Sequence, residues 1–235
     1  MDRLISGAQR LGINLTSMQV ELFRQYYDEL VQWNRRLNLT SVVDYEDVQT
    51  RHFLDSLTVA SLIDDKSSRV IDIGSGAGFP GLPLKIALPG MELTLVESVK
   101  KKAAFLDHLV GCLGLADVVV VAERAETLAH DDRYRERYDV AVARGVARLP
   151  TLAELALPLC AIGGRFVAMK KGDIGDEVAG ASKAVEVLGG RLREVQVVGL
   201  AEFTGEARSL VIIDKVSATP DRYPRRAGMP RKRPL

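Results

Sequence analysis

Three glycines and an acidic residue cluster in the segment Asp72–Gly78 (DIGSGAG), at the end of an apolar run that is typical of a buried strand. Glycine permits positive φ angles and lets a ligand approach the backbone closely. Ligands of open α/β sheets bind beyond the carboxyl ends of the strands. The spacing of Gly74, Gly76 and Gly78 therefore predicts a site for a nucleotide-like ligand.

Three ligands compete for this loop. A phosphate-binding P-loop needs Lys-Ser or Lys-Thr after its last glycine, and the sequence has neither there. A dinucleotide fingerprint matches at Gly76, Gly78 and Gly81. That match is weak because Gly74 already closes the strand, and Pro80 lacks a backbone N–H where a pyrophosphate needs donors. S-adenosylmethionine, which has no phosphate, is the third candidate.

Acidic residues favour the third candidate. Asp72 suits an ammonium group better than a pyrophosphate, although it could instead have the structural role of binding loop amides. Glu97 ends the next predicted strand and suits the ribose hydroxyls of either a dinucleotide or S-adenosylmethionine. The segment Ala122–Leu128 follows the third strand, where the backbone of Ala125 and Glu126 would read the adenine edge. The alternative for this segment is an ordinary acidic helix N-terminus.

Strand and helix patterns alternate along the chain after residue 68, which predicts an α/β fold with a doubly wound, Rossmann-like and mostly parallel sheet. The last two apolar runs are joined by Ala201–Arg208 without a helical pattern, so the final strand is expected to be antiparallel. Strands are expected at 69–74, 92–97, 118–122, 138–144, 164–171, 195–200 and 208–216, and helices at Leu82–Leu88, Val99–Leu113, Leu149–Cys160 and Gly175–Leu188.

The N-terminal quarter of the chain has a helical pattern. Apolar residues recur at three- and four-residue steps from Leu22 to Leu37, on a helix capped by Thr16 or Ser17. A second helix is expected at Tyr45–Ile63, and the aromatic side chains of this region are assigned to core packing. The chain is thus divided into a helical extension (1–65), an α/β domain (66–218) and a basic tail (219–235).

Composition limits where the protein can be located and which kinds of site it can contain. No apolar run reaches the roughly 20 residues needed to cross a bilayer, and no signal peptide is evident, so the cytoplasm is expected. Cys112 and Cys160 lie in apolar stretches and are expected to be buried free thiols. The histidines (His52, His108 and His130) are not at ligand spacing, so no metal site is expected.

The net charge of +1 conceals an uneven distribution. Residues 221–235 carry six basic residues and one acidic residue. Composition leaves a polyanion contact and a solvated, disordered terminus equally open.

Longer motifs are more specific than the glycines. They are WNRRLNLTS (33–41), RHFLDSL (51–57), DIGSGAGFPGLPL (72–84), ARGVA (143–147), MKKG (169–172) and the ending YPRRAGMPRKRPL. With these motifs nearly the whole chain resembles the bacterial 16S ribosomal RNA guanine-N7 methyltransferases, once called glucose-inhibited division protein B.

The resemblance implies an S-adenosylmethionine-dependent methyltransferase fold and transfer to N7 of one guanine, with 16S ribosomal RNA or the small ribosomal subunit as partner. A monomer suffices for this activity. The N7 lone pair carries no proton, so no catalytic side chain is expected and positioning supplies the catalysis. The family's cofactor contacts carry over to Gly74, Gly76, Phe79, Glu97, Ser98, Val99, Ala125, Glu126 and Arg144.

Basic residues are the candidates for binding the RNA. Arg144 is expected beside cofactor and guanine, where its guanidinium suits the exocyclic oxygen, with a structural ion pair as the alternative. Two other functions stay open: an NAD-dependent oxidoreductase and a non-enzymatic RNA- or ribosome-binding protein. The predicted RNA-backbone surface comprises Lys170, Lys171, Arg222, Arg225, Arg226, Arg231, Lys232 and Arg233.

Overall fold

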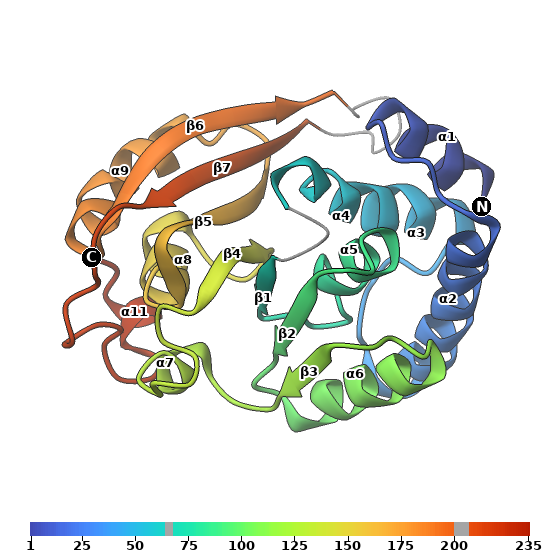
Figure 1. The fold of residues 1–235 in the computed structure, drawn as a ribbon, viewed down its shortest axis with the longest axis horizontal. Coiled ribbons are helices and arrows are strands. Elements are labelled where there is room, and N and C mark those ends of the chain that lie inside the picture. Colours follow the sequence, from blue (N-terminus) through green and yellow to red (C-terminus); the bar gives the residue numbers. More distant parts are fainter. Residues whose placement is uncertain (64–67, 200–206) are drawn as a thin grey trace.

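The fold is centred on one seven-stranded sheet with the strand order β3-β2-β1-β4-β5-β7-β6 (Figure 1). The computed structural model describes residues 1–63, 68–199 and 207–235. The strands are β1 (Arg69–Ile73), β2 (Glu92–Val96), β3 (Val118–Val121), β4 (Tyr138–Arg144), β5 (Cys160–Lys171), β6 (Gly190–Val198) and β7 (Arg208–Lys215).

Strands β1 to β5 are mutually parallel, whereas β7 lies antiparallel between β5 and β6. This arrangement confirms the predicted mostly parallel sheet with an antiparallel last strand. The carboxyl ends of β1 to β5 and the amino end of β7 meet at one edge, where Lys171 pairs with Arg208. The predicted connection from 201 to 206 lies outside the described residues.

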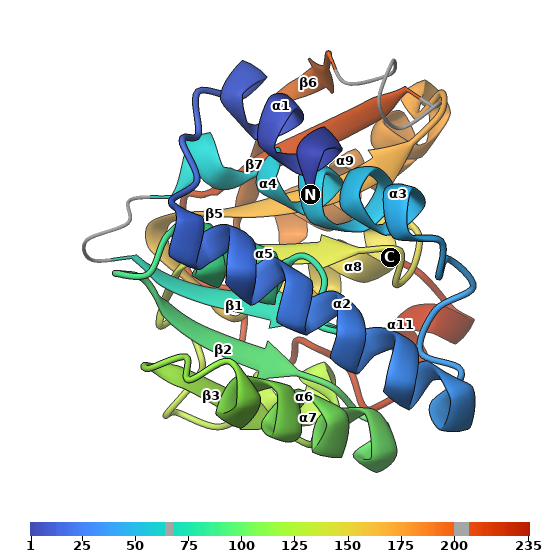
Figure 2. The same ribbon diagram turned by 90° about the vertical axis from the view of Figure 1, so that its right-hand side faces the viewer.

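Helices cover both faces of the sheet (Figures 1 and 2). The N-terminal helices, α5 and α6 lie on one face, and α8 and α9 lie on the other. Their bounds are α1 (Asp2–Arg10), α2 (Ser17–Leu37), α3 (Tyr45–Val48), α4 (Asp55–Leu57), α5 (Gly81–Ala87), α6 (Lys100–Cys112), α7 (Ala125–Leu128), α8 (Leu149–Ala156), α9 (Gly175–Val187) and α11 (Met229–Lys232).

The helical extension is built largely as its sequence predicts. Thr16 caps α2 in a reciprocal capping box with Gln19. The second helical region is not a regular α-helix, because a π-helical turn at Gln49–Leu54 separates α3 from α4 and a 3-10 turn follows at Ala60–Leu62. Such widened turns recur at functional sites.

The extension shares its hydrophobic core with one face of the sheet. Phe23 and Phe53 lie in the same buried cluster as Val70 and Leu95. Tyr26, also fully buried, donates a hydrogen bond of 2.6 Å from Oη to the carbonyl oxygen of Ala77 in the glycine loop. The expected core role of these aromatic residues is confirmed, and α2 also fixes the loop that follows β1.

Two details differ from the sequence-based expectation. Helix α8 ends at Ala156 and Cys160 begins β5, because Pro158 disfavours continuation of the helix. Cys160 is buried as expected, and burial raises the pKa of its thiol to about 12. Cys112 was expected to be buried but is exposed, at the last residue of α6.

Among the described helices, none is both long and apolar enough to cross a membrane.

Candidate active site

The loop after β1 is held in place by Glu97, at the end of β2. Glu97 Oε2 accepts a hydrogen bond of 3.0 Å from Gly76 N, and Oε1 accepts one of 2.7 Å from Val99 N. Gly74 adopts a φ of +71°, and a Cβ there would lie 2.7 Å from Val146 Cγ2. Both the positive φ and the close approach of the β4 turn require glycine at this position.

Asp72 supports the same loop from beneath. Its Oδ2 accepts a hydrogen bond of 2.9 Å from Gly81 N, the first amide of α5, which is the structural role considered for this residue. Its Oδ1 is buried and has no partner among the described residues. Burial raises the pKa of Asp72 to about 7, against the opposing effects of the Gly81 amide and Arg144.

A cavity of about 210 Å³ opens above the carboxyl ends of β1, β2 and β4, and we name it the tail-side cavity. Four of the predicted cofactor residues line it: Gly74, Ser98, Ala125 and Glu126. Its far wall comes from the C-terminal tail, through Gly228, Pro230 and Arg231. The sequence did not predict a wall from the tail.

Buried polar contacts attach the tail to α7 and α8. Glu154 is fully buried and receives the Arg225 guanidinium at 2.6 Å and 2.8 Å, as well as Arg225 N at 2.8 Å. Gly228 N donates to Glu126 Oε1 at 2.8 Å, and Thr151 Oγ1 donates to the carbonyl oxygen of Pro230 at 3.0 Å. The tail is therefore an ordered part of the site, and the disordered alternative is wrong.

A second cavity, of about 520 Å³, lies beyond the ends of β4, β5 and β7. We name it the basic cavity, because Arg51, Arg144, Lys171 and Arg208 line it. The π-helical turn and α4 contribute its opposite wall through His52 and Asp55.

Asp55 joins two arginines of the basic cavity. Its Oδ2 lies 2.9 Å from Arg144 Nη1, and its Oδ1 lies 2.8 Å from Arg208 Nε. The Asp55 side chain is 3% exposed, whereas that of Arg144 is 17% exposed. Arg144 Nη1 also donates to the carbonyl oxygen of Arg51, and Nη2 lies 3.2 Å from His52 Nδ1. These contacts engage three of the five N–H groups of the guanidinium.

His52 is neutral in this environment. Burial and the nearby Arg144 charge lower its pKa to about 3. His52 Nδ1 lies 3.0 Å from the carbonyl oxygen of Arg51 and 3.2 Å from Arg144 Nη2, and Nε2 lies 2.8 Å from Thr40 Oγ1. The ring stacks on Phe79 with centroids 4.5 Å apart, and Arg144 lies 5.0 Å from the centroid of Phe79.

The structure therefore distributes the predicted cofactor residues around one turn, Arg144–Ala147. Gly74, Ser98, Ala125 and Glu126 face the tail-side cavity, and Arg144 faces the basic cavity. Gly76, Glu97 and Val99 are linked in the supporting loop. Phe79 is buried beneath Arg144 and His52.

Sequence reasoning missed the wall formed by Arg51, His52 and Asp55, together with Arg208. One signal was available, because Asp55 lies between the inward-facing Phe53 and Leu57 on a predicted core helix. A charged residue among buried positions needs a partner. Its partner Arg208 lies 153 residues away in sequence, beyond the reach of any local pattern.

Two residues of the predicted RNA surface are already engaged within the protein. Lys170 Nζ lies 2.6 Å from Glu177 Oε1 and 2.9 Å from the carbonyl oxygen of Ala147. Arg225 is bound to Glu154. The other members of the predicted surface are exposed: Lys171, Arg222, Arg226, Arg231, Lys232 and Arg233.

Solved structures of low sequence identity share this fold. A SAM-dependent O-methyltransferase from Thermotoga maritima gives a TM-score of 0.53 at 17% identity, over 83% of this chain and 72% of its own. The structure of M. jannaschii TYW2 in complex with AdoMet gives a TM-score of 0.56 at 11% sequence identity. The match covers 74% of this chain and 78% of that chain. Both similarities confirm the predicted fold class.

Relatives of much higher identity share the whole chain. The ribosomal RNA small subunit methyltransferase G of Roseiflexus castenholzii is 54% identical over 236 residues, with 100% of both chains covered. A protein of the same name from Dehalococcoides mccartyi is 48% identical, with 100% of both chains covered. Another from Bacillus cereus is 42% identical, over 100% of this chain and 98% of its own. The two alternative functions find no support among these relatives.

A family profile described as rRNA small subunit methyltransferase G (GidB) matches residues 19–208. Because the profile covers most of the chain and full-length relatives are 42–54% identical, this protein belongs to the rRNA small subunit methyltransferase G family, which confirms the resemblance and the predicted class of enzyme.

Proposed function

We propose that this protein transfers a methyl group from S-adenosylmethionine to N7 of a guanine in 16S ribosomal RNA, with the cofactor in the tail-side cavity and the guanine in the basic cavity. The observation that carries the proposal is the turn Arg144–Ala147. It lines both cavities, so groups bound in the two would meet across it.

The residues of the tail-side cavity fit this cofactor. Gly74 presents bare backbone on the cavity wall, and Glu97, which holds the loop beside the cavity, retains a lone pair on each oxygen for ribose hydroxyls. The unpartnered Oδ1 of Asp72 is a buried acceptor beneath the loop, suited to supporting an ammonium group. The first amide of α5 is already used by Asp72, which disfavours a pyrophosphate.

The protein's part in the reaction is positioning. S-adenosylmethionine supplies a methyl group on a sulfonium sulfur. The guanine N7 lone pair lies in the plane of the base and carries no proton, so no side chain has to act as a general base. Arg144 has two N–H donors without a partner among the described residues, and these suit the exocyclic oxygen of guanine. Asp55 positions Arg144 by holding the other side of its guanidinium.

The exposed basic residues around this edge are suited to the RNA backbone. Lys171 lies at the basic cavity, and Arg231, Lys232 and Arg233 lie beside the tail-side cavity. We further propose that a monomer is the active form, working in the cytoplasm where ribosomal RNA is found. Light scattering of the purified protein tests the monomer.

Two measurements test the proposed function. Equilibrium binding should show affinity for S-adenosylmethionine and none for NAD. Small ribosomal subunits from a strain lacking the methyltransferase should accept label from methyl-labelled cofactor, and borohydride and aniline treatment should then cleave the RNA at one methylated guanine. Label at another atom, or affinity for NAD alone, would contradict the proposal. Parallel reactions with naked 16S RNA identify the preferred substrate.

Replacing Arg144 by lysine tests the guanine contact. Lysine keeps the positive charge beside Asp55 but lacks the planar fork of donors. The rate of methyl transfer should fall by roughly 10- to 100-fold, because a shifted contact to the exocyclic oxygen moves the guanine out of line with the methyl group. The thermal midpoint should stay near that of the unmodified protein. Full transfer rate with unchanged cofactor affinity would show that Arg144 is a structural ion pair only.

The tail offers a test of RNA binding that leaves the cavity wall intact. The double variant Lys232→Gln/Arg233→Gln should bind RNA more weakly and with a shallower salt dependence, by about 0.7 in slope for each phosphate that is no longer neutralised. Cofactor affinity should not change. The matched control is Arg133→Gln/Arg137→Gln, which removes the same charge near the amino end of β4. Equal salt slopes for both variants would contradict the role of the tail.

A further inference from the structure

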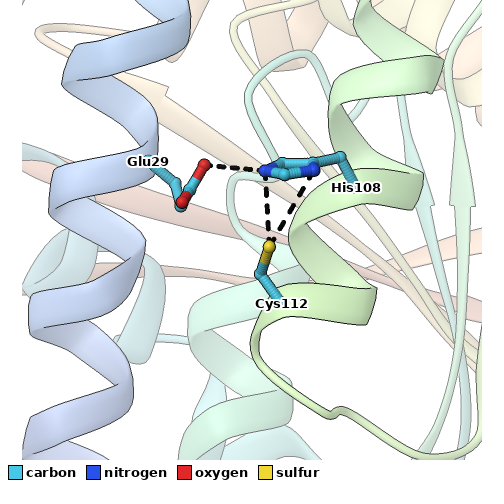
Figure 3. Close-up of side chains that lie close together, drawn as sticks. All are labelled: Glu29, His108 and Cys112. Carbon is cyan, nitrogen blue, oxygen red and sulfur yellow. Dashed lines mark hydrogen bonds and ion pairs between the residues drawn. The ribbon is translucent and has the colours of Figure 1, made fainter.

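A cluster of metal-ligating side chains lies outside the active site, between α2 and α6 (Figure 3). Glu29 comes from α2, whereas His108 and Cys112 lie one turn apart on α6 and point to the same side. His108 Nε2 lies 2.7 Å from Glu29 Oε2 and 3.3 Å from Cys112 Sγ. All three ligand atoms lie within 4.8 Å of one another.

We propose that Glu29, His108 and Cys112 form a site for a zinc ion that cross-links the helical extension to α6. In a tetrahedral zinc site, neighbouring nitrogen, oxygen and sulfur ligands lie roughly 3.3–3.6 Å apart. His108 Nε2 and Cys112 Sγ already meet this spacing at 3.3 Å. Because Sγ also lies 3.9 Å from Nδ1, the thiol has to turn toward the Nε2 side, and the Glu29 carboxylate has to withdraw by about 0.6 Å. Water completes the fourth position.

The donor set selects the metal. Thiolate and imidazole favour zinc over magnesium or calcium, which bind oxygen ligands. On binding, the Cys112 thiol releases its proton to solvent and the neutral His108 ring carries its proton on Nδ1 in place of Nε2, so that sulfur and Nε2 each donate an electron pair to the metal, with no redox step. Cys112 is exposed, and the side chains of His108 and Glu29 are 37% and 25% exposed, so the ion can enter from solvent.

The surroundings suit a cross-link. Trp33 of α2 packs on Phe105 and His108 of α6, with ring centroids 5.5 Å and 4.9 Å apart. This packing fixes the His108 ring beside Glu29. A groove of about 300 Å³ adjoins the cluster, and Arg36 lines it together with Glu29 and His108. The positive charge of Arg36 opposes the binding of a cation. Removing that charge should therefore strengthen zinc binding, which gives a variant with an effect opposite to that of losing a ligand.

The sequence-based exclusion of a metal site rested on spacing within the chain. It missed the cluster because Glu29 is separated from His108 by 79 residues. The assumption that Cys112 is buried also removed a ligand from consideration.

Calorimetric titration of the tag-free, reduced protein with zinc chloride tests the site. We expect one equivalent to bind, with an affinity at least about tenfold weaker in Glu29→Gln, His108→Asn and Cys112→Ser, since loss even of a ligand's supporting partner costs that much. Asp28→Asn, an exposed carboxylate next to Glu29, is the matched control and should bind as the unmodified protein does. Arg36→Gln should bind more tightly.

Cobalt and thermal unfolding give independent readouts. Cobalt(II) should produce a thiolate-to-metal charge-transfer band that disappears in Cys112→Ser. Zinc should raise the thermal midpoint of the unmodified protein but not of that variant, because the ion binds only the folded state. No binding by the unmodified protein, unchanged affinity in Cys112→Ser, or a cobalt complex without the band overturns the proposal, whatever the methyl-transfer activity of the preparation.

Discussion

Replacement of Asp55 by asparagine is expected to lower the free energy of unfolding by about 3–5 kcal/mol. Asp55 is the carboxylate between Arg144 and Arg208, and its side chain is 3% exposed. Without its charge, two guanidinium groups face each other with little access to water. Chemical denaturation of the variant and of the unmodified protein measures the difference.

A control variant and a stability-restoring variant test whether the loss of stability comes from the buried, unpaired charges. Glu21→Gln breaks the exposed pair between Glu21 and Arg24, whose side chains are about half exposed, and should lower the free energy of unfolding far less. The triple variant Asp55→Leu/Arg144→Met/Arg208→Leu removes Asp55 together with the two arginines that it joins, and it should recover most of the stability. It should still fail to transfer methyl groups, because Arg144 is gone. An Asp55→Asn variant as stable as Glu21→Gln would refute the buried-charge account.

The second large effect concerns Asp72 and depends on pH. Its pKa is about 7 in the folded protein, against an ordinary value of 3.8. Below about pH 4 both states hold the proton and the group does not affect stability. Between about pH 4 and pH 7 the unfolded chain ionises first, so stability is lost as pH rises, to a total of about 4 kcal/mol. Asp72 therefore destabilises the protein at neutral and alkaline pH.

Asp72→Asn should remove this dependence on pH. The amide keeps an acceptor for Gly81 N and cannot ionise, whereas any cost of its unpaired N–H group is independent of pH. As pH rises from about 5 to about 8, the free energy of unfolding of the variant should increase by roughly 3 kcal/mol relative to that of the unmodified protein, as measured by urea unfolding. Asp132→Asn, an exposed carboxyl, should gain nothing. A stability difference that stays constant over this range would contradict burial of the ionised group. Cofactor affinity of Asp72→Asn should fall if Asp72 supports the ammonium group as proposed.

The sequence predicts what local patterns encode. The β-branched runs indicate β1 to β5, and the glycines of 74–78 indicate the ligand loop, because strand burial and positive φ leave signatures within a few residues. Thr16 and Gln19 likewise encode the start of α2. Glu97 has the expected position at the end of its strand, although its hydrogen bonds to the loop were not predicted.

Contacts between distant segments leave no such signature. The pairs Asp55–Arg208, Glu154–Arg225 and Glu29–His108 join residues 153, 71 and 79 positions apart. Helical periodicity predicts on which face of a helix a side chain lies, but it does not predict which distant residue that side chain contacts. For that reason the sequence predicts the tail only as a candidate surface for RNA or a solvated terminus, whereas in the structure it forms one wall of a cavity.

The order of strands has a consequence for how the protein is made. Strand β6 lies at the edge of the sheet and pairs only with β7 among the described strands, yet β7 is synthesised after it. Residues 208–235 supply Arg208 to one cavity and Gly228, Pro230 and Arg231 to the other. Neither cavity is therefore complete until this segment, which follows β6 in the chain, has paired with β5 and packed against α7 and α8.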